Sequence, residues 1–374
     1  MTDKQRAKEK QAGITRRDFL KYASASAGVT AATFALSKSV SGTLPATNPS
    51  VKEQFLHGHP HGVSAESQVQ GGITPKDFLV NYYRPPRDPV TGARVFDLTA
   101  APQSITIANG VQFPAWAFTA PSGGPTVPGP TLRVDEGDNV LIKFHNADKH
   151  PHTIHLHGIH PADADGVFEV LNAGEDYEYR FKAEPFGLFP YHCHVTPVKK
   201  HIEKGLYGAF IVDPVDPPVG ALGVRPAADR EFVMVMNGFD VDFDGENEFY
   251  TVNGIANYYL DNPIEIGVGQ LIRIYLVNMT EFDPVNSFHL HGNMFRLYRT
   301  GTRFDPDPSV TSVPPTDSRW LYADRFAEVT DTVFLGQGER AILEFVPRHR
   351  GRFLFHAHQS EFLELGWTGR FNVV

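Results

Sequence analysis

The stretch RVDEGDNVLIKFHN, residues 133–146, reveals the architecture of this chain because its pattern occurs a second time. Residues 265–278 read EIGVGQLIRIYLVN, and the two stretches align without a gap. Each begins with a turn, containing Gly137 or Gly269, and continues into an alternating apolar run that ends in asparagine. Alternation of this kind has the period of a half-buried β-strand. The repeat therefore predicts a duplicated, strand-rich unit.

Two further pairs of segments follow in the same order. HLHG occurs at 155–158 and at 289–292, and YRFKAEPFGLFPYHCH at 179–194 matches LEFVPRHRGRFLFHAH at 343–358. Short strand-like runs divided by glycine and proline are typical of Greek-key β-sandwiches. We therefore predict an all-β fold with two tandem sandwich domains. In chain order we expect a leader at 1–45, an extension at 46–74, domain 1 at 75–213, a linker at 214–230 and domain 2 at 231–374.

The composition agrees with this fold and limits the classes of function. The 374 residues include 33 glycines and 29 prolines, and long helical patterns are scarce. A formal net charge of −9 without a sustained basic stripe argues against nucleic acid as a partner. The 17 histidines favour metal binding, because histidine is the commonest metal ligand.

The amino-terminal segment has the features of an export signal. Arg16 and Arg17 in TRRDFLK match the twin-arginine signal, and the apolar run at 22–36 follows them. That run is too short and too polar for a membrane span, which needs about 20 apolar residues. We expect export by the twin-arginine route, a periplasmic or secreted location, and no membrane-spanning helix. A single cysteine then excludes an internal disulfide.

Histidines occur in four His-X-His pairs at positions that correspond between the two repeats. Because side chains on a strand alternate between its faces, both histidines of a pair share one face. The eight residues are His155, His157, His192, His194, His289, His291, His356 and His358. Neutral buried imidazoles in this number need partners, and a metal cluster supplies them.

The only cysteine, Cys193, lies inside the YHCH pair and should point to the opposite face of its strand. His152 precedes the HLHG pair out of register and is expected on that face, and His201 follows in HIEKGLYG. Two histidine nitrogens, a thiolate and a weak or absent axial ligand define a blue-copper site. Leu206 stands where an axial methionine often sits. Because leucine cannot coordinate copper, we expect a relatively high reduction potential.

Domain 2 lacks the residues of this second site. Asn286, Ala357 and Phe362 stand at the positions of the first histidine, the cysteine and the second histidine. All three ligands are therefore missing together, as expected after loss of one whole metal site.

These motifs resemble those of the multicopper oxidases, specifically small two-domain laccase-like enzymes related to copper nitrite reductases. HTIHLHG and YHCH with HIEKGL resemble the half that carries a blue copper, and FHLHG and FHAH resemble the half without one. The resemblance implies two cupredoxin-like domains with four coppers per monomer. It assigns type 1 copper to His152, Cys193 and His201, with Leu206 as a non-ligating axial neighbour, and type 2 copper to His155 and His289. It assigns the type 3 pair to His157, His192, His194, His291, His356 and His358.

The resemblance also implies a reaction and an assembly. A small reducing substrate would deliver single electrons to type 1 copper, and four electrons would reduce dioxygen to water at a trinuclear cluster. A homotrimer would join domain 1 of one chain to domain 2 of the next. Asp165 matches the acidic residue that relays protons in this family, although an ordinary Asp-Gly turn is the alternative. Asp163 is a further candidate, and the usual glutamate after the cysteine motif is absent.

Two other functions stay open. A copper nitrite reductase resembles this chain, but its catalytic copper takes one histidine from domain 2, whereas domain 2 here offers four. A non-catalytic copper-binding or electron-transfer protein would need fewer paired histidines, and 5 methionines do not suit a methionine-rich copper store. The sequence leaves the reductant open between a phenol and a metal ion. It assigns no function to HGHPHG at 57–62 or to the long domain 2 insertion at 300–325.

Overall fold

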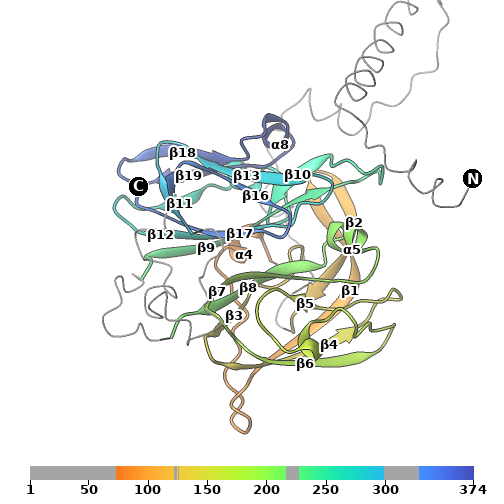
Figure 1. The fold of residues 1–374 in the computed structure, drawn as a ribbon. Coiled ribbons are helices and arrows are strands. Elements are labelled where there is room, and N and C mark those ends of the chain that lie inside the picture. Colours follow the sequence, from red (N-terminus) through yellow and green to blue (C-terminus); the bar gives the residue numbers. More distant parts are fainter. Residues whose placement is uncertain (1–72, 122–123, 125, 216–226, 299–327) are drawn as a thin grey trace, which may run out of the picture. The chain divides into compact units, whose positions relative to one another are not determined.

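In a computed structural model, the structure describes residues 73–121, 124, 126–215, 227–298 and 328–374. The predicted leader, the HGHPHG segment and the domain 2 insertion lie outside the described residues, as do most of the extension and of the linker. Strands dominate the described part, which confirms the predicted all-β fold (Figure 1).

Domain 1, the name used here for strands β1 to β8, consists of two four-stranded sheets with the orders β2-β1-β4-β6 and β3-β8-β7-β5. Its strands are β1 (Arg94–Ala108), β2 (Val111–Thr119), β3 (Leu132–Asp135), β4 (Asn139–Asn146), β5 (His155–Leu156), β6 (Asp176–Lys182), β7 (Gly187–His192) and β8 (Tyr207–Asp213). β1 pairs with β4 in parallel, and β3 pairs with β8 in parallel. Parallel neighbours within a sheet require crossover connections, as expected for a sandwich rather than a simple meander.

Domain 2, the name used for β9 to β19, has a six-stranded sheet, β10-β9-β12-β17-β14-β15, and a five-stranded sheet, β11-β19-β18-β13-β16. Its strands are β9 (Arg230–Phe239), β10 (Phe249–Val252), β11 (Ile264–Ile266), β12 (Ile272–Asn278), β13 (Val285–Leu290), β14 (Phe295–Tyr298), β15 (Glu328–Thr330), β16 (Thr332–Gly336), β17 (Arg340–Phe345), β18 (Gly351–His356) and β19 (Thr368–Val373). The parallel pairs recur as β9 with β12 and β11 with β19. The repeat seen in the sequence is therefore a repeat of topology.

Short helices occupy equivalent places in the two domains. α5 (Val198–Glu203) connects β7 to β8, and α8 (Ser360–Glu364) connects β18 to β19. The other helices of the described residues are α4 (Pro75–Phe78), the 3₁₀ helix η2 (Ala162–Ala164) and α6 (Tyr258–Asp261). Among the described residues, no helix has the length and apolarity that a membrane span requires.

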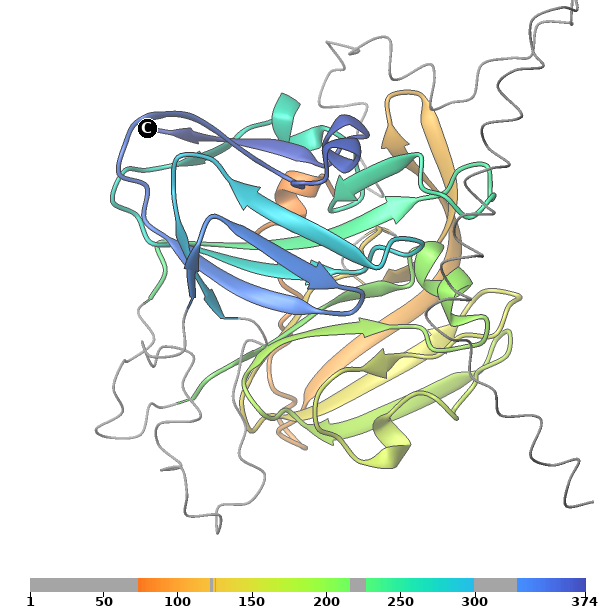
Figure 2. The same cartoon turned by 45° about the horizontal axis from the view of Figure 1, so that its top comes forward.

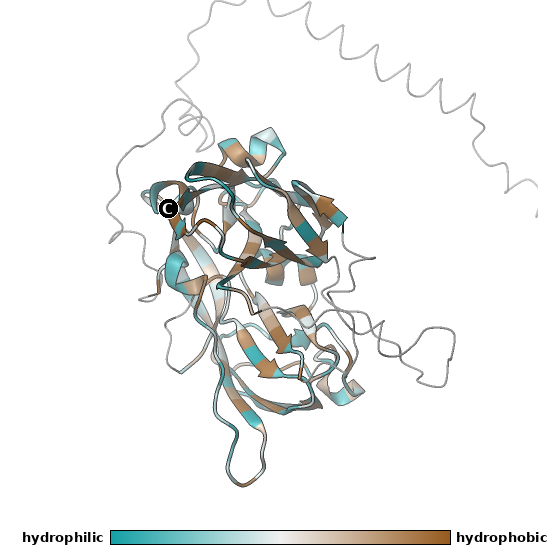
Figure 3. Cartoon of the chain, turned by 90° about the vertical axis from the view of Figure 1, so that its left-hand side faces the viewer, coloured by the Kyte–Doolittle hydropathy of each residue, from teal (hydrophilic) through white to brown (hydrophobic). Residues whose placement is uncertain are grey.

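The two domains share a buried apolar contact. Val233 and Val235 of β9 and Val277 of β12 are fully buried and belong to the hydrophobic cluster that fills domain 1. Arg133 of β3 adds a polar link, because it pairs with Asp213 at 2.7 Å and with Glu231 at 2.8 Å. Figure 2 shows the β7–β8 layer lying against domain 2, and Figure 3 shows apolar residues interspersed with polar ones along the strands. This packing positions the strand ends that carry the histidines.

Candidate metal centres

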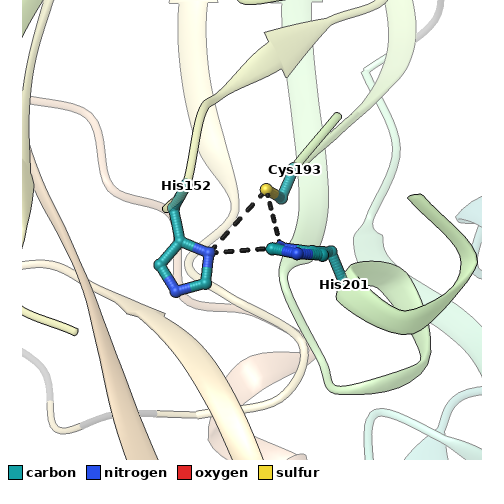
Figure 4. A group of neighbouring side chains, drawn as sticks. All are labelled: His152, Cys193 and His201. Atoms are coloured by element: carbon teal, nitrogen blue, oxygen red, sulfur yellow. Dashed lines mark hydrogen bonds between the residues drawn. The ribbon is translucent and has the colours of Figure 1, made fainter. Parts of the chain in front are cut away.

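Cys193, His152 and His201 come together in domain 1 (Figure 4). Cys193 directly follows β7, His152 lies just before β5, and His201 is on α5. The thiol sulfur is 3.2 Å from Nδ1 of His201 and 3.9 Å from Nδ1 of His152, and the two Nδ1 atoms are 3.2 Å apart. All three residues are buried. The group therefore presents one sulfur and two nitrogen atoms to a common centre.

The burial of this group sets its protonation. Burial lowers the pKa of His201 to about 4 and lowers the pKa of His152, so both imidazoles are neutral at neutral pH. Burial raises the pKa of the Cys193 thiol. Because metal ligation needs neutral histidine and thiolate, a bound cation would replace the thiol proton. The thiol also accepts a hydrogen bond from the Thr153 N–H at 3.4 Å.

Two residues that the sequence analysis did not single out support this group. The Asp148 carboxylate accepts a hydrogen bond from Nε2 of His152 at 3.1 Å, and both side chains are buried. This contact holds the proton on Nε2 and leaves the lone pair of Nδ1 directed at Cys193. The Trp116 ring covers the site, with its centroid 5.2 Å from that of His152 and 4.9 Å from that of His201.

Leu206 begins the turn into β8 and is fully buried. Its carbonyl accepts the Cys193 N–H at 3.0 Å, and its own N–H is donated to the His201 carbonyl at 3.2 Å. Backbone contacts therefore tie it to both ligand candidates, while its side chain offers no donor atom.

The four domain 1 histidines of the His-X-His pairs form an array at the adjoining strand ends. His155 pairs in register with His192 across β5 and β7, and its ring centroid lies 5.2 Å from each of the other three. Nε2 of His157 is 3.2 Å from Nε2 of His192. Burial lowers the pKa of His157 to about 3 and that of His192 to about 4. His194 completes the array, and its N–H is donated to the Thr153 hydroxyl at 3.0 Å.

Domain 2 repeats this array. The His289 centroid lies 5.0 Å from that of His291, 5.3 Å from that of His356 and 5.2 Å from that of His358. Nε2 of His291 is 2.9 Å from Nε2 of His356. The His358 N–H is donated to the Ser287 hydroxyl at 2.8 Å, which reproduces the His194 contact of domain 1. Each array holds three histidines whose ligand atoms lie within 4.8 Å of one another.

The two arrays do not combine within one chain. In the part of the chain that the structure describes, no group of close metal-ligating atoms draws on both domains. The domain 2 neighbour of His157 is instead the turn after β16, where a Cβ built on Gly338 would lie 3.6 Å from its ring. Within the described residues, each array therefore presents its imidazoles separately from the other.

Each array also has an aspartate at its leading histidine. Nδ1 of His155 donates to the Asp165 carbonyl at 2.7 Å, and the Asp165 carboxylate lies 3.4 Å from that nitrogen. Nδ1 of His289 lies 3.0 Å from the Asp331 carbonyl and 4.0 Å from the Asp331 carboxylate. Asp163 is exposed, and its carbonyl accepts a hydrogen bond from the Tyr177 hydroxyl at 2.9 Å. Asp331 is thus the counterpart of Asp165, and the sequence analysis missed it.

The predicted Asp-Gly turn at Asp165 is present as well. Gly166 has a φ of 72°, and a Cβ there would lie 1.8 Å from the Ile154 carbonyl oxygen. Only glycine fits so close to a neighbouring backbone. The turn and the contact with His155 therefore coexist.

In domain 2, the positions that correspond to the Cys193 group of domain 1 take part in apolar packing and in one hydrogen bond. Trp367 stands at the position of Leu206, is buried, and donates its indole N–H to the side-chain amide oxygen (Oδ1) of Asn286 at 3.1 Å. Ala357 is buried beside it, and Phe362 stacks on Tyr250 with ring centroids 3.7 Å apart. The residues at the three lost ligand positions are thus integrated into the core.

One further group of acidic side chains has a structural explanation. Asp240, Asp242 and Glu248 lie together in the β9–β10 loop. Both Asp240 oxygens accept backbone hydrogen bonds, from Asp244 at 3.1 Å and Gly245 at 2.8 Å, and Glu248 accepts from Val241 at 2.8 Å. These contacts fold the loop.

Sequence comparisons place both domains in one family. One multicopper oxidase family model matches residues 121–217 and another matches residues 232–374. A solved structure of a multicopper oxidase is 42% identical, covers 84% of this chain, is covered over 100% of its own length, and has a TM-score of 0.70. The two ranges contain every ligand candidate named above.

Curated relatives include nitrite reductases. The copper-containing nitrite reductase of Neisseria meningitidis serogroup B is 28% identical over 233 residues, which are 57% of this chain and 56% of the relative. A probable nitrite reductase–hydroxylamine oxidoreductase fusion protein of Kuenenia stuttgartiensis is 28% identical over 307 residues, 75% of this chain but 32% of the relative. This chain thus spans about half the length of the Neisseria relative and about a third of the length of the Kuenenia relative. With both halves matched by family models and the solved oxidase matched over its full length, the chain belongs to the multicopper oxidase family.

Proposed function

We propose that this protein oxidises a small reducing substrate one electron at a time and reduces dioxygen to water. The observation that carries the proposal is the pair of matched four-histidine arrays beside a single His₂Cys group. Domain 2 contributes four histidines rather than one, which supports a cluster of several coppers over the single catalytic copper of a nitrite reductase.

The donor set fits copper. Cys193, His152 and His201 offer soft sulfur and imidazole nitrogen in a buried group, which is the ligand set of a blue-copper centre. In each array, imidazole nitrogens about 3 Å apart face each other, and burial keeps those of His157 and His192 neutral. When bound, copper would supply one-electron transfer at the first group and dioxygen reduction at the arrays.

The protein's own residues would orient and connect these centres. Cys193 faces the first group, while its covalent neighbours His192 and His194 face the array, so three consecutive residues join the two centres. Asp165 and Asp331 lie at Nδ1 of the leading histidine of each array, leaving Nε2 free for ligation. Their carboxylates are placed to move protons to and from the arrays.

A homotrimer is part of this proposal. Each array is an open half, and a cyclic assembly would close a domain 1 array against the domain 2 array of the next chain. Type 2 copper would then take His155 and His289, and the type 3 pair would take the remaining six histidines. We further propose export by the twin-arginine route, which the Arg16–Arg17 pair supports.

Copper quantification with optical and electron paramagnetic resonance spectra tests the proposal. We expect four coppers per monomer, a blue thiolate absorption band and a type 2 signal. Cys193→Ser should remove the blue band and leave the other coppers bound. Loss of every copper in that variant would contradict two separate centres.

The nitrite reductase alternative is supported by the relatives that carry that name. It predicts one non-blue copper per monomer and nitrite turnover faster than dioxygen uptake. Dioxygen uptake and nitrite consumption should therefore be measured on the same preparation. A fully metallated protein that consumes neither acceptor with a phenolic, ferrous or cuprous reductant would instead be a binding or electron-transfer protein.

A further inference from the structure

The helix that carries His201 is too short to be stable by itself. α5 contains 6 residues, and Pro197 at its amino-terminal cap makes no side-chain hydrogen bond. Because isolated helices of this length are not stable in water, contacts with the rest of the protein must fix α5. Its position matters, since Nδ1 of His201 lies 3.2 Å from the Cys193 sulfur (Figure 4). Groups that share a site have to be held to within about 0.5 Å of the productive geometry.

Two phenylalanines of domain 2 contact the two ends of α5 through lysine ammonium groups. Nζ of Lys199, in the first turn, lies 3.9 Å from the ring centroid of Phe282 in the β12–β13 loop. Nζ of Lys204, at the carboxy-terminal cap, lies 4.0 Å from the ring centroid of Phe243 in the β9–β10 loop. A cation within about 6 Å of the face of an aromatic ring is attracted to it. Domain 2 therefore contacts α5 on both sides of His201.

The contact of Lys204 is enclosed. The residue is 9% exposed, its ammonium group also lies 4.8 Å from the ring centroid of Phe113, and it donates to the Pro114 carbonyl at 3.1 Å. The Lys204 carbonyl accepts the N–H of Trp116 at 2.8 Å, and the Trp116 ring covers the Cys193 group. Displacement of Lys204 would therefore disturb both the helix and the cover of the metal centre.

Phe243 and Phe282 hold a backbone conformation that such residues rarely adopt. Their φ angles are 62° and 69°, and among the described residues the other two non-glycine residues with positive φ are asparagines, which tolerate this region better. Bulky residues persist in the left-handed region where the surroundings enforce them, and they concentrate at functional sites. Asp240 folds the first of the two loops, because it accepts the N–H groups of Asp244 and Gly245. Both loops thus place a ring against α5 in spite of the backbone cost.

The equivalent helix of domain 2 lacks both lysines. With Phe362 of α8 at the position of His201, the residues at the two lysine positions are Ser360 and Leu365. Phe362 anchors α8 itself, because it stacks on Tyr250. In α5 the same position holds a histidine that faces the thiol, so the anchor has to come from other residues. The lysines occur in the helix that carries a ligand candidate and are replaced in the helix that does not.

We propose that Phe243 and Phe282 are positioning residues for the Cys193 group. They hold α5, through its two lysines, in the place where its histidine faces the thiol. The inference rests on the proposed function only in that the Cys193 group holds copper. It makes the metal centre of domain 1 depend on two loops of domain 2, the domain that has no such centre.

Amide hydrogen exchange on the copper-loaded protein tests the hold on α5. Phe243→Asn and Phe282→Asn each remove a ring and leave a residue that tolerates positive φ. We expect the α5 amides to exchange about fivefold faster in each variant, the factor of one cation–π contact, while α8 exchanges as before. Phe243→Tyr and Phe282→Tyr keep the ring face and should match the original protein.

Copper release tests whether this hold reaches the metal centre. The Cys193 group is buried, so copper leaves only after a segment that carries a ligand opens, and α5 is the segment outside the sheets. With an excess of chelator, the blue band should decay about fivefold faster in each asparagine variant and at the original rate in each tyrosine variant. In a Lys204→Met background, Phe243→Asn should cause no further change, because both substitutions remove the same contact.

Asn257→Gly changes another left-handed residue (φ 59°) in a different loop, and as the matched control it should alter neither rate. The inference is overturned if α5 exchanges equally in the asparagine variants and the original protein, or if α5 and α8 accelerate alike. Faster exchange without faster copper release also overturns it, because the rings would then only support the fold. Dioxygen uptake is recorded separately. A protein whose α5 and copper release respond as expected, but which consumes no dioxygen, refutes the proposed oxidase and keeps the positioning role.

Discussion

Replacement of Asp148 by alanine tests whether a buried carboxylate prepares the Cys193 group for its metal. The side chains of Asp148 and His152 are 2% and 0% exposed, and their hydrogen bond is 3.1 Å long. Without the carboxylate, the proton of His152 is free to move from Nε2 to Nδ1, the atom that faces Cys193. The variant therefore weakens metal binding without removing a ligand.

The magnitude follows from the burial of the pair. A hydrogen bond to a charged group contributes about 1.5–3 kcal/mol, and about 1.4 kcal/mol corresponds to a factor of ten in affinity. Copper affinity at this centre should thus fall by about 10- to 100-fold, the usual effect of losing a partner of a ligating histidine. Asp148→Asn keeps an acceptor but loses the charge, so it should cost less than Asp148→Ala.

The assay is competition with a copper chelator, followed by the blue thiolate band. Asp176→Ala is the matched control, because Asp176 pairs with His145 at 2.8 Å on the surface, where the side chains are 76% and 43% exposed. That variant should bind copper like the original protein. Equal affinities in the Asp148 and Asp176 variants would refute the argument.

Three further predictions concern the arrays, the core and pH. Asp165→Asn and Asp331→Asn should each lower dioxygen uptake by about 100-fold at unchanged copper content, whereas unchanged uptake would leave both aspartates a purely structural role. Trp367→Ala should lower the free energy of unfolding by about 3–5 kcal/mol in urea titrations, since this buried indole also bonds to Asn286. Burial raises the pKa of Glu281 from 4.5 to about 7, so ionisation destabilises the fold as pH rises through this range. Below pH 4.5, Glu281→Gln should have the same free energy of unfolding as the original protein. Above pH 7 its free energy of unfolding should be higher, by only about 1 kcal/mol because the group is partly exposed. Equal urea midpoints at pH 8 would contradict this prediction.

The strand period was sufficient to predict how the histidines and the cysteine are placed. His192 and Cys193 are adjacent in sequence, and alternation sends one to the array and the other to the opposite group, as the distances show. His201 was assigned in a different way, from the ligand set of a blue-copper site and from the resemblance of HIEKGL to the half of the family that carries one. The prediction succeeded here because local backbone geometry determines which side of a strand a residue faces.

Residues supplied from distant segments could not be predicted in this way. Asp331 lies between β15 and β16 and contacts His289 there. The long insertion between β14 and β15 separates the two residues in the sequence, so their spacing does not indicate that they meet. Trp116 arrives from β2 and covers the Cys193 group only because the domain folds into a sandwich. Neither residue carries a motif, so only tertiary packing assigns them to the sites.

Comparison of the two domains explains why domain 2 lacks all three ligands of the Cys193 group and not only one of them. If a buried metal site lost one ligand, the remaining histidine or thiol would keep its desolvation cost without its partner. Domain 2 avoids this cost because Trp367 fills the volume and donates to Asn286, while Phe362 stacks on Tyr250. In domain 1 the smaller Leu206 stands at the corresponding position, and the thiol and two imidazoles lie together in a buried group. Four positions, those of Asn286, Ala357, Phe362 and Trp367, therefore together distinguish the core of domain 2 from the domain that carries the His₂Cys group.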